Sequence, residues 1–188
     1  KCDALMANLV TLIRKRQLGA IAAIVDVAAF GRVFGSDQDI QYLVAKTVIA
    51  LAAYLVHKYS DNGTEELNLW FEKGDGNGTV NKAHADLDGC GGKYGLDRMR
   101  EIAFRDKRLV PLQAADLVAR EAYKWAGNLG TGRPIRKPLQ RLSDRAVLMF
   151  WQEPELIELR ERRCLEDHAA FAEMLFVGNP SIEDILKP

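Results

Sequence analysis

The sequence predicts an α/β fold, and three stretches of the chain lead to this prediction. Residues 110–126 repeat apolar side chains at spacings of three and four, which is the period of a helix. Residues 20–27 form a nearly unbroken apolar run, typical of a strand covered on both faces. Residues 66–72 alternate apolar and polar side chains, as a strand with one buried face does. With 188 residues, 48% of them hydrophobic, the chain can bury a sizeable core as a single domain.

The net charge limits the partners that the chain can bind, and the cysteine content indicates its cellular compartment. The formal net charge is zero, so any site for a polyanion must be a local patch. The three cysteines, Cys2, Cys90 and Cys164, form no Cys-x-x-Cys pair, which argues against a disulfide framework or a zinc ribbon. We therefore expect a reducing, cytoplasmic location, with no membrane span and no signal peptide. The chain opens at Lys1 without a Met, and we expect it to be the later part of a longer protein.

The first half of the chain reads as helix, strand and long helix. An amphipathic helix is expected over residues 3–17, before the apolar strand. Asp26 ends the apolar run, either as a site residue or, more in keeping with its position, as a cap at the strand end. Ser36 with Asp39 three residues later resembles a capping box for a helix over residues 40–59.

The alternating strand ends in a carboxylate and a glycine-rich turn. Glu72 occupies the carboxyl end of the strand, where open α/β sheets usually bind ligands, and is our first candidate site residue. The following loop, residues 73–78, carries Asp75 as a weaker candidate. It is not a calcium loop, because Val80 and Asp86 stand where Gly and Glu are needed, and it lacks the Gly-Lys-Ser/Thr ending of a phosphate loop. A mobile turn is the better interpretation.

The central helix begins at Pro111, whose fixed φ suits the first turn. We expect its buried face to be the small-residue stripe of Leu112, Ala115, Ala119, Ala122 and Ala126. Gln113, Asp116 and Arg120 share the adjoining face. A carboxylate beside a buried stripe needs a partner, so Asp116 either pairs with Arg120 or binds a metal.

The other elements are less distinctive. We expect a short helix over 79–87, a glycine-rich loop over 88–95, a strand over 100–104 and a Gly/Pro loop over 127–138. Residues 146–151 fit a strand or a buried helix equally well. A charged helix from Glu153 to about Phe176 is expected on the outside of the domain, where it would be available to a second subunit in a homo-oligomer.

Two further groups of residues bear on function. The densest basic cluster is Arg133, Arg136, Lys137 and Arg141. Such a cluster is usually a solvated surface, but beside an acidic metal site it would hold phosphates. The histidines at 57, 84 and 168 have no metal-ligand spacing and are expected to be surface or packing residues.

The two candidate carboxylates lie in motifs that resemble a known family. Residues 69–75 (Leu-Trp-Phe-Glu-Lys-Gly-Asp), followed after a strand by 110–119 (Val-Pro-Leu-Gln-Ala-Ala-Asp-Leu-Val-Ala), are similar to the family called domain of unknown function 3800. The resemblance implies an RNase H-like fold, with a mixed β-sheet flanked by helices. The core would span about 3–127, with a C-terminal helical extension over about 139–188.

The resemblance also implies a function. It predicts a metal-dependent nuclease with Glu72 and Asp116 as catalytic metal ligands, Gln113 and Asp75 supporting them, and Mg²⁺ or Mn²⁺ as cofactor. The basic cluster would bind the nucleic acid. The family's Asp-Glu-Ser-Gly strand, which supplies the first ligand, does not occur in these 188 residues. We expect it upstream; the alternative is a non-catalytic binding or scaffold domain that keeps the fold.

Overall fold

The computed structural model describes residues 8, 10, 11, 15, 20–59, 65–90, 92–129, 131–134, 137–141 and 146–176. The strands are β1 (Ala20–Val25), β2 (Leu67–Glu72), β3 (Met99–Arg105) and β4 (Ala146–Trp151). The helices are α2 (Val27–Phe34), α3 (Ile40–Tyr59), α4 (Asn77–Asp88), α5 (Val110–Ala126), α6 (Lys137–Gln140), α7 (Glu153–Glu161) and α8 (His168–Phe176), with 3-10 turns at Gly92–Tyr94 and Leu96–Arg98. Most of the helix expected over residues 3–17 lies outside the described residues.

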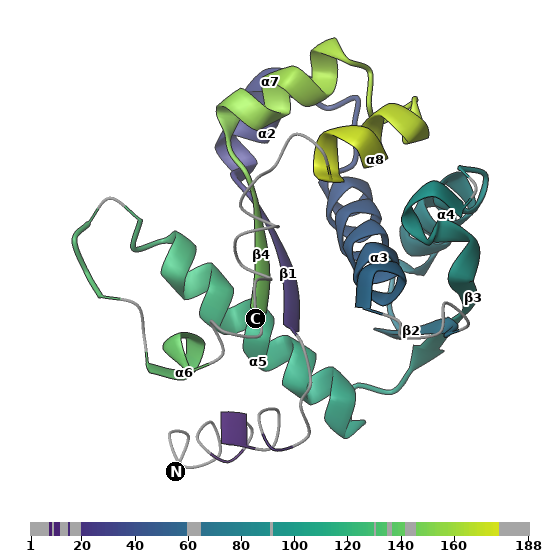
Figure 1. Cartoon of the computed structure of the whole chain (residues 1–188). Helices are drawn as coiled ribbons and strands as arrows, with labels where there is room; N and C mark the ends of the chain where they lie inside the picture. The colour runs from purple at the N-terminus through teal and green to yellow at the C-terminus, as the bar shows by residue number, and fades with distance from the viewer. Residues whose placement is uncertain are drawn as a thin grey trace.

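The strands form two small parallel sheets (Figure 1). In the first, β1 pairs with β4 from Ala20↔Ala146 to Val25↔Trp151. In the second, β2 pairs with β3 from Leu67↔Met99 to Glu72↔Arg105. The α/β class is confirmed. The single mixed sheet that we expected is not what the described residues form, since both pairs are parallel and no pairing joins β1–β4 to β2–β3 within that part of the chain.

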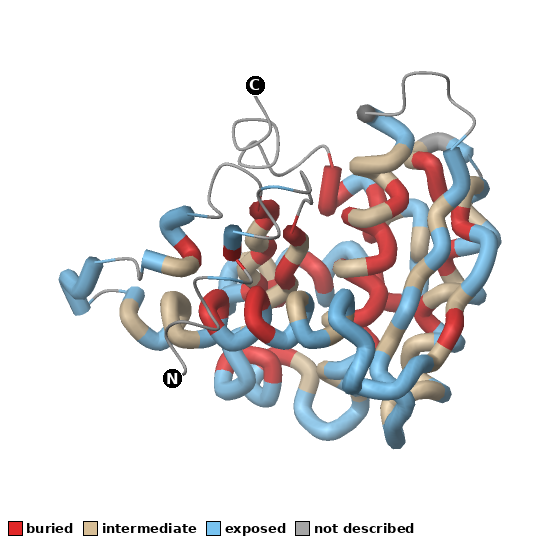
Figure 2. Tube along the Cα trace, turned by 90° about the horizontal axis from the view of Figure 1, so that it is seen from below, coloured by how far each residue is buried: buried red, intermediate tan, exposed pale blue. Residues whose placement is uncertain are grey.

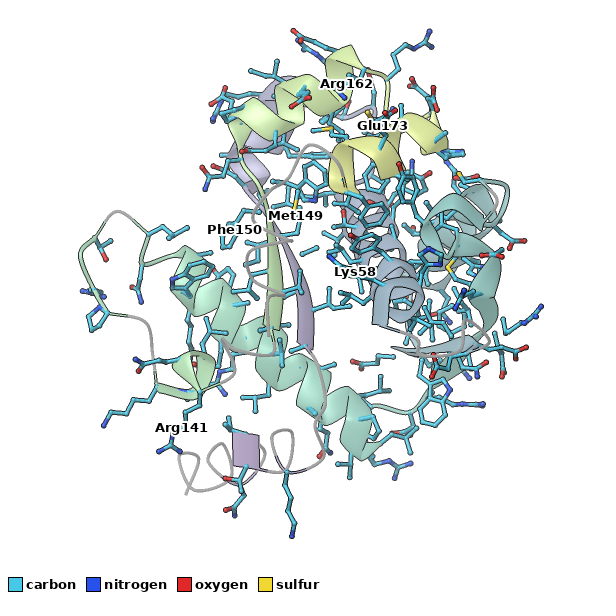
Figure 3. All side chains as sticks on the ribbon, viewed as in Figure 1. Lys58, Arg141, Met149, Phe150, Arg162 and Glu173 are labelled. Atoms are coloured by element: carbon cyan, nitrogen blue, oxygen red, sulfur yellow. The ribbon has the colours of Figure 1, made fainter. Side chains whose placement is uncertain are left out.

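The β1–β4 sheet separates two hydrophobic clusters. Ile21 and Val25 of β1 face the main cluster, which includes residues of α3, while Ala22 and Ile24 face a smaller cluster with α5. On β4, Met149 and Phe150 leave the strand in opposite directions (Figure 3). Met149 joins the main cluster, and the Phe150 ring packs edge-on against the α5 residue Trp125 with centroids 4.8 Å apart. The expectation of a strand covered on both faces is therefore confirmed for Ala20–Val25, whereas Val27 begins α2 and is 71% exposed. Residues 146–151 are a strand.

The helix α3 runs through the middle of the main cluster, with buried residues along most of its length (red in Figure 2). It ends at Tyr59, as predicted. Its amino end is capped by Asp39, which accepts a hydrogen bond from the Gln41 backbone N–H at 2.8 Å, and not by the Ser36 capping box. Asp26 follows the end of β1, but it caps the amino end of α2, a helix that was not predicted, by accepting from Ala29 N at 2.9 Å.

The apolar character of α3 bears on the expectation of no membrane span, which stays a prediction. Among the described residues α3 is long and apolar enough to cross a membrane by length and composition, with a mean hydropathy of 1.5 over Ile40–Lys58. More than half of this stretch, 56%, is buried inside the molecule, and core helices of soluble proteins pass the same test.

The C-terminal region differs from the single outer helix expected over residues 153–176. The helix is interrupted after Glu161, and Arg163 adopts a positive φ of 53° in the turn before α8. The larger apolar side chains of α8 are buried in the main cluster, and those of Phe171 and Leu175 are fully buried. The apolar pattern of 171–176, not the charges of 153–163, decides where this segment packs. The region expected as an extension thus contributes β4 and α8 to the core.

The central helix α5 presents a different face to the sheet from the one predicted. Its buried residues are Leu117, Val118, Glu121 and Ala122. Ala115 and Ala119 of the predicted stripe are exposed. The larger apolar side chains of Leu117 and Val118 bury more area than alanines do, so the helix turns them toward β1.

Candidate functional site

The candidate carboxylate Glu72 lies where the sequence places it. Leu67, Leu69 and Phe71 pack toward the main cluster, so the alternate side chains Asn68, Trp70 and Glu72 point away from it and are exposed. The strand ends at Glu72, and its ladder with β3 continues one step further, because Lys73 N donates to Arg105 O at 2.9 Å. Within the described part of the chain, the Glu72 carboxylate has no hydrogen-bond or ion-pair partner. It is therefore free to take a ligand.

The turn after Glu72 is shorter than predicted, because α4 begins at Asn77 and not at Thr79. The Asn77 side chain closes it by accepting from Gly74 N at 3.0 Å. Asp75 stands exposed in this turn, three residues beyond Glu72, and has no side-chain partner among the described residues. The turn holds both carboxylates at the carboxyl edge of the β2–β3 sheet.

The second candidate, Asp116, is exposed in the first half of α5. The ion pair with Arg120 that we considered is not formed; both side chains are described and both are exposed. Since Asp116 is solvated and does not lie beside a buried stripe, its charge needs no structural partner. The helix itself contacts β1 and β2, which brings it alongside the sheet that carries Glu72 (Figure 1).

Gln113 does not contact either candidate carboxylate. Its side-chain amide donates to the backbone carbonyl of Arg108 at 3.4 Å and so closes the turn before α5. In that turn, Arg108 makes two hydrogen bonds of 2.9 Å to the Asp106 carboxylate, and this pairing lowers the pKa of Asp106. Among the described residues no group of three or more His, Cys, Asp or Glu side chains gathers as a metal-ligand cluster.

The basic cluster follows the far end of α5. Arg133 and Lys137 are both exposed. Arg136, which lies between them in the sequence, is outside the described residues. Arg141 lines a small pocket with Val10 and Lys15, on the opposite side of the molecule from β2 and β3 (Figure 3). The cluster is thus separated from the β2–β3 edge by much of the length of α5.

A buried polar network that we did not predict surrounds Lys46. This α3 lysine is 0% exposed, and its ammonium group lies 2.9 Å from Cys164 O, 3.3 Å from Leu165 O and 2.9 Å from His168 Nδ1. An ammonium has three N–H donors, and here each has one acceptor. His168 Nδ1 must accept, so the neutral ring carries its proton on Nε2. Lys46 therefore fastens α3 to the turn between α7 and α8.

The network continues to a surface pocket. His168 Nε2 lies 3.8 Å from Asp86 Oδ1, and Tyr42 donates to the other Asp86 oxygen at 2.6 Å. A pocket of about 750 Å³ opens over His168, Asp86 and Cys90, with Arg162 and Arg163 on its rim. Arg162 is bound to Glu158 at 2.8 Å and Arg163 to Glu166 at 3.2 Å, so both rim cations are already paired.

Burial sets the protonation of this network. Desolvation lowers the pKa of Lys46 to about 8 and also lowers the pKa of His168, which additionally lies beside the Lys46 cation. Burial raises the pKa of the Cys90 thiol, so that it is not an activated nucleophile at neutral pH. These properties are those of a structural anchor. The sequence signal that would have revealed it is Lys46 itself, the only charged residue between Ile40 and Val56.

Comparison of the chain with family models, with curated proteins and with solved structures found no match.

Proposed function

We propose that this chain is an RNase H-like domain that hydrolyses phosphodiester bonds of nucleic acid with divalent cations, Mg²⁺ or Mn²⁺. The resemblance of residues 69–75 and 110–119 to the domain of unknown function 3800 family supports the proposal. The observation that carries it is the position of Glu72, exposed and without a protein partner in the described chain, at the carboxyl end of a parallel strand.

The donor chemistry of the proposed site suits Mg²⁺. Glu72, Asp75 and Asp116 offer hard carboxylate oxygens that no described side chain engages, and Mg²⁺ commonly takes one or two carboxylates while keeping several waters. Glu72 and Asp116 would hold the metal, with Asp75 orienting metal-bound water. When bound, two divalent cations stabilise the attacking and leaving oxygens of the displacement.

The basic cluster would bind the nucleic acid at a point distant from the phosphate that is cleaved. Arg133, Arg136, Lys137 and Arg141 follow the end of α5, a helix of 17 residues and hence about 25 Å long. A nucleic acid that contacts both Glu72 and this cluster must run along that helix. The cluster then supplies salt-dependent affinity, since each phosphate neutralised releases counterions.

Cleavage assays on single carboxylate variants test the proposal. With Mg²⁺ and labelled oligonucleotides, Glu72→Gln and Asp116→Asn should each abolish cleavage, because each removes a charged metal ligand. Both side chains are exposed and unpaired in the described structure, so the melting temperature of each variant should stay that of the parent.

The matched controls are Glu161→Gln on α7 and Asp88→Asn at the end of α4, exposed carboxylates without a described partner. Both should cleave like the parent. Parent protein that shows no cleavage with either Mg²⁺ or Mn²⁺, or full activity in both site variants, would reject the nuclease proposal. If the parent protein does not cleave, a non-catalytic binding domain is the better explanation.

A further inference from the structure

An exposed tryptophan lies beside the proposed catalytic carboxylate. Trp70 is two residues before Glu72 on the same outward face of β2, a separation of about 6.6 Å along the strand. Its exposed fraction is 48%, which is high for a large aromatic side chain. About half of its surface is open to solvent, so part of its flat ring is available to a ligand.

The neighbouring strand leaves the ring accessible and adds a cation. In the parallel register Trp70 lies opposite Ala103, whose methyl group cannot cover an indole. Arg105, opposite Glu72, places its guanidinium 5.9 Å from the indole centroid, near the outer limit of a cation–π contact. Its ion pair with Glu101 is long, at 4.0 Å, and both side chains are about half exposed. Arg105 can therefore turn toward a phosphate at little cost.

More cations border this face. Lys73 follows Glu72 directly, and Lys107 follows the end of β3; both are exposed. An aromatic ring flanked by such cations is the arrangement that binds single strands, in which the base stacks on the ring and the backbone follows the positive charge. In a duplex the faces of the bases are covered by their neighbours, so this ring favours an unpaired base.

We propose that the outward face of β2–β3 binds single-stranded nucleic acid, with a base stacked on Trp70 and the adjacent phosphate held by Arg105 next to Glu72. The inference deepens the proposed function and rests on it for the identity of the polymer. It assigns the substrate class: an unpaired strand, or an unpaired stretch within a duplex.

Binding titrations of the full chain in metal-free buffer test this, with labelled single strands of DNA and RNA and the corresponding duplexes. Trp70→Ala should weaken single-strand binding about tenfold or more, whereas Trp70→Phe should retain most of the affinity because it keeps a stacking ring. Trp70→Ala should leave the slope of log affinity against log salt unchanged, and Arg105→Ala should flatten it by about 0.7.

The control is Ile157→Ala, which shortens an exposed apolar side chain on α7, an element that lies apart from β2, β3 and α5 (Figure 1), and it should bind like the parent. An unchanged affinity in Trp70→Ala, an equal loss in Trp70→Phe, or equally tight binding of duplexes would overturn the inference. Trp70-dependent single-strand binding without cleavage in either Mg²⁺ or Mn²⁺ supports it and rejects the nuclease proposal. Cleavage of single strands that does not depend on Trp70 supports the nuclease proposal and overturns the inference about Trp70.

Discussion

At the scale of single residues, Lys46 shows how a charge can be tolerated in a core. Burying an unpaired ammonium is expensive, and the described part of the chain gives Lys46 no carboxylate partner. Two backbone carbonyls and a neutral histidine satisfy its three donors instead. Its aliphatic stem and ammonium also lie against aromatic rings, with Nζ 4.4 Å from the centroid of Phe171. The remaining desolvation cost is what lowers its pKa.

The lowered pKa of Lys46 predicts that stability rises with alkaline pH. The folded-state pKa is about 8 and the ordinary value is 10.5. Between these values the unfolded chain binds more protons, so the free energy of unfolding should increase with pH, by at most ~3 kcal/mol. Tyr42, Cys90 and Cys164 have raised pKa values and act in the opposite direction, so the test is the difference between the parent and Lys46→Met. Urea denaturation should show this difference growing in favour of the parent as pH rises. The exposed Lys137→Met is the control and should follow the parent; a difference that does not change with pH would contradict the prediction.

At the scale of elements, α5 is the instructive case. Its boundaries were predicted to within a residue, because Pro111 and Gly127 mark them chemically. Its buried face was predicted only in part, since Ala122 of the expected stripe is buried but Ala115 and Ala119 are exposed. A helix with alanines on two sides offers two stripes, and local spacing cannot say which one meets the sheet. The structure resolves this through Leu117 and Val118, whose contacts with β1 depend on residues 90 positions away in the sequence.

Paired alanine substitutions on α5 test the observed face. Ala122 is 1% exposed, so Ala122→Leu should overpack the contact with β1 and cost about 1–3 kcal/mol. Ala119 is exposed, so Ala119→Leu should change stability by no more than about 0.5 kcal/mol. Denaturation midpoints of the two variants provide the comparison. Equal losses would mean that both alanines are buried, as the small-residue stripe had suggested.

The candidate site was predictable to the same degree as the strands that carry it. The alternation of residues 66–72 correctly placed Glu72 exposed at a strand end. The role expected for Gln113 was not seen, because its amide found a closer acceptor in the turn before the helix. The Lys46 network was missed because its partners come from residues 164–168 and 86, which only the tertiary fold brings together.

At the scale of the whole molecule, the main cluster is assembled from both ends of the chain. It joins α2 and α3 with β4, α7 and α8, and the Trp151 indole donates to Thr47 of α3 at 3.0 Å. The rings of Tyr54 and Phe176 stack with centroids 4.4 Å apart. The C-terminal region is therefore as much a part of the core as the segment that carries the candidate carboxylates.

Two substitutions on α8 test this assignment. Phe171 is 0% exposed and packs on both Trp151 and Lys46, so Phe171→Ala should lower the free energy of unfolding by about 3–5 kcal/mol. Glu173 lies on the exposed face of the same helix (Figure 3), and Glu173→Ala should have little effect. Thermal melts distinguish the two variants. A small loss in Phe171→Ala would place α8 outside the core.

The large sequence separation between Lys46 and its acceptors has a consequence for folding during translation. Lys46 leaves the ribosome well over a hundred residues before its acceptors at 164, 165 and 168. Throughout that interval α8 does not cover the apolar side chains of α3. A nascent chain in this state is prone to aggregation and attracts chaperones that recognise exposed apolar segments. Ribosomes stalled before residue 164 should therefore retain such chaperones, and ribosomes that have released residue 176 should not.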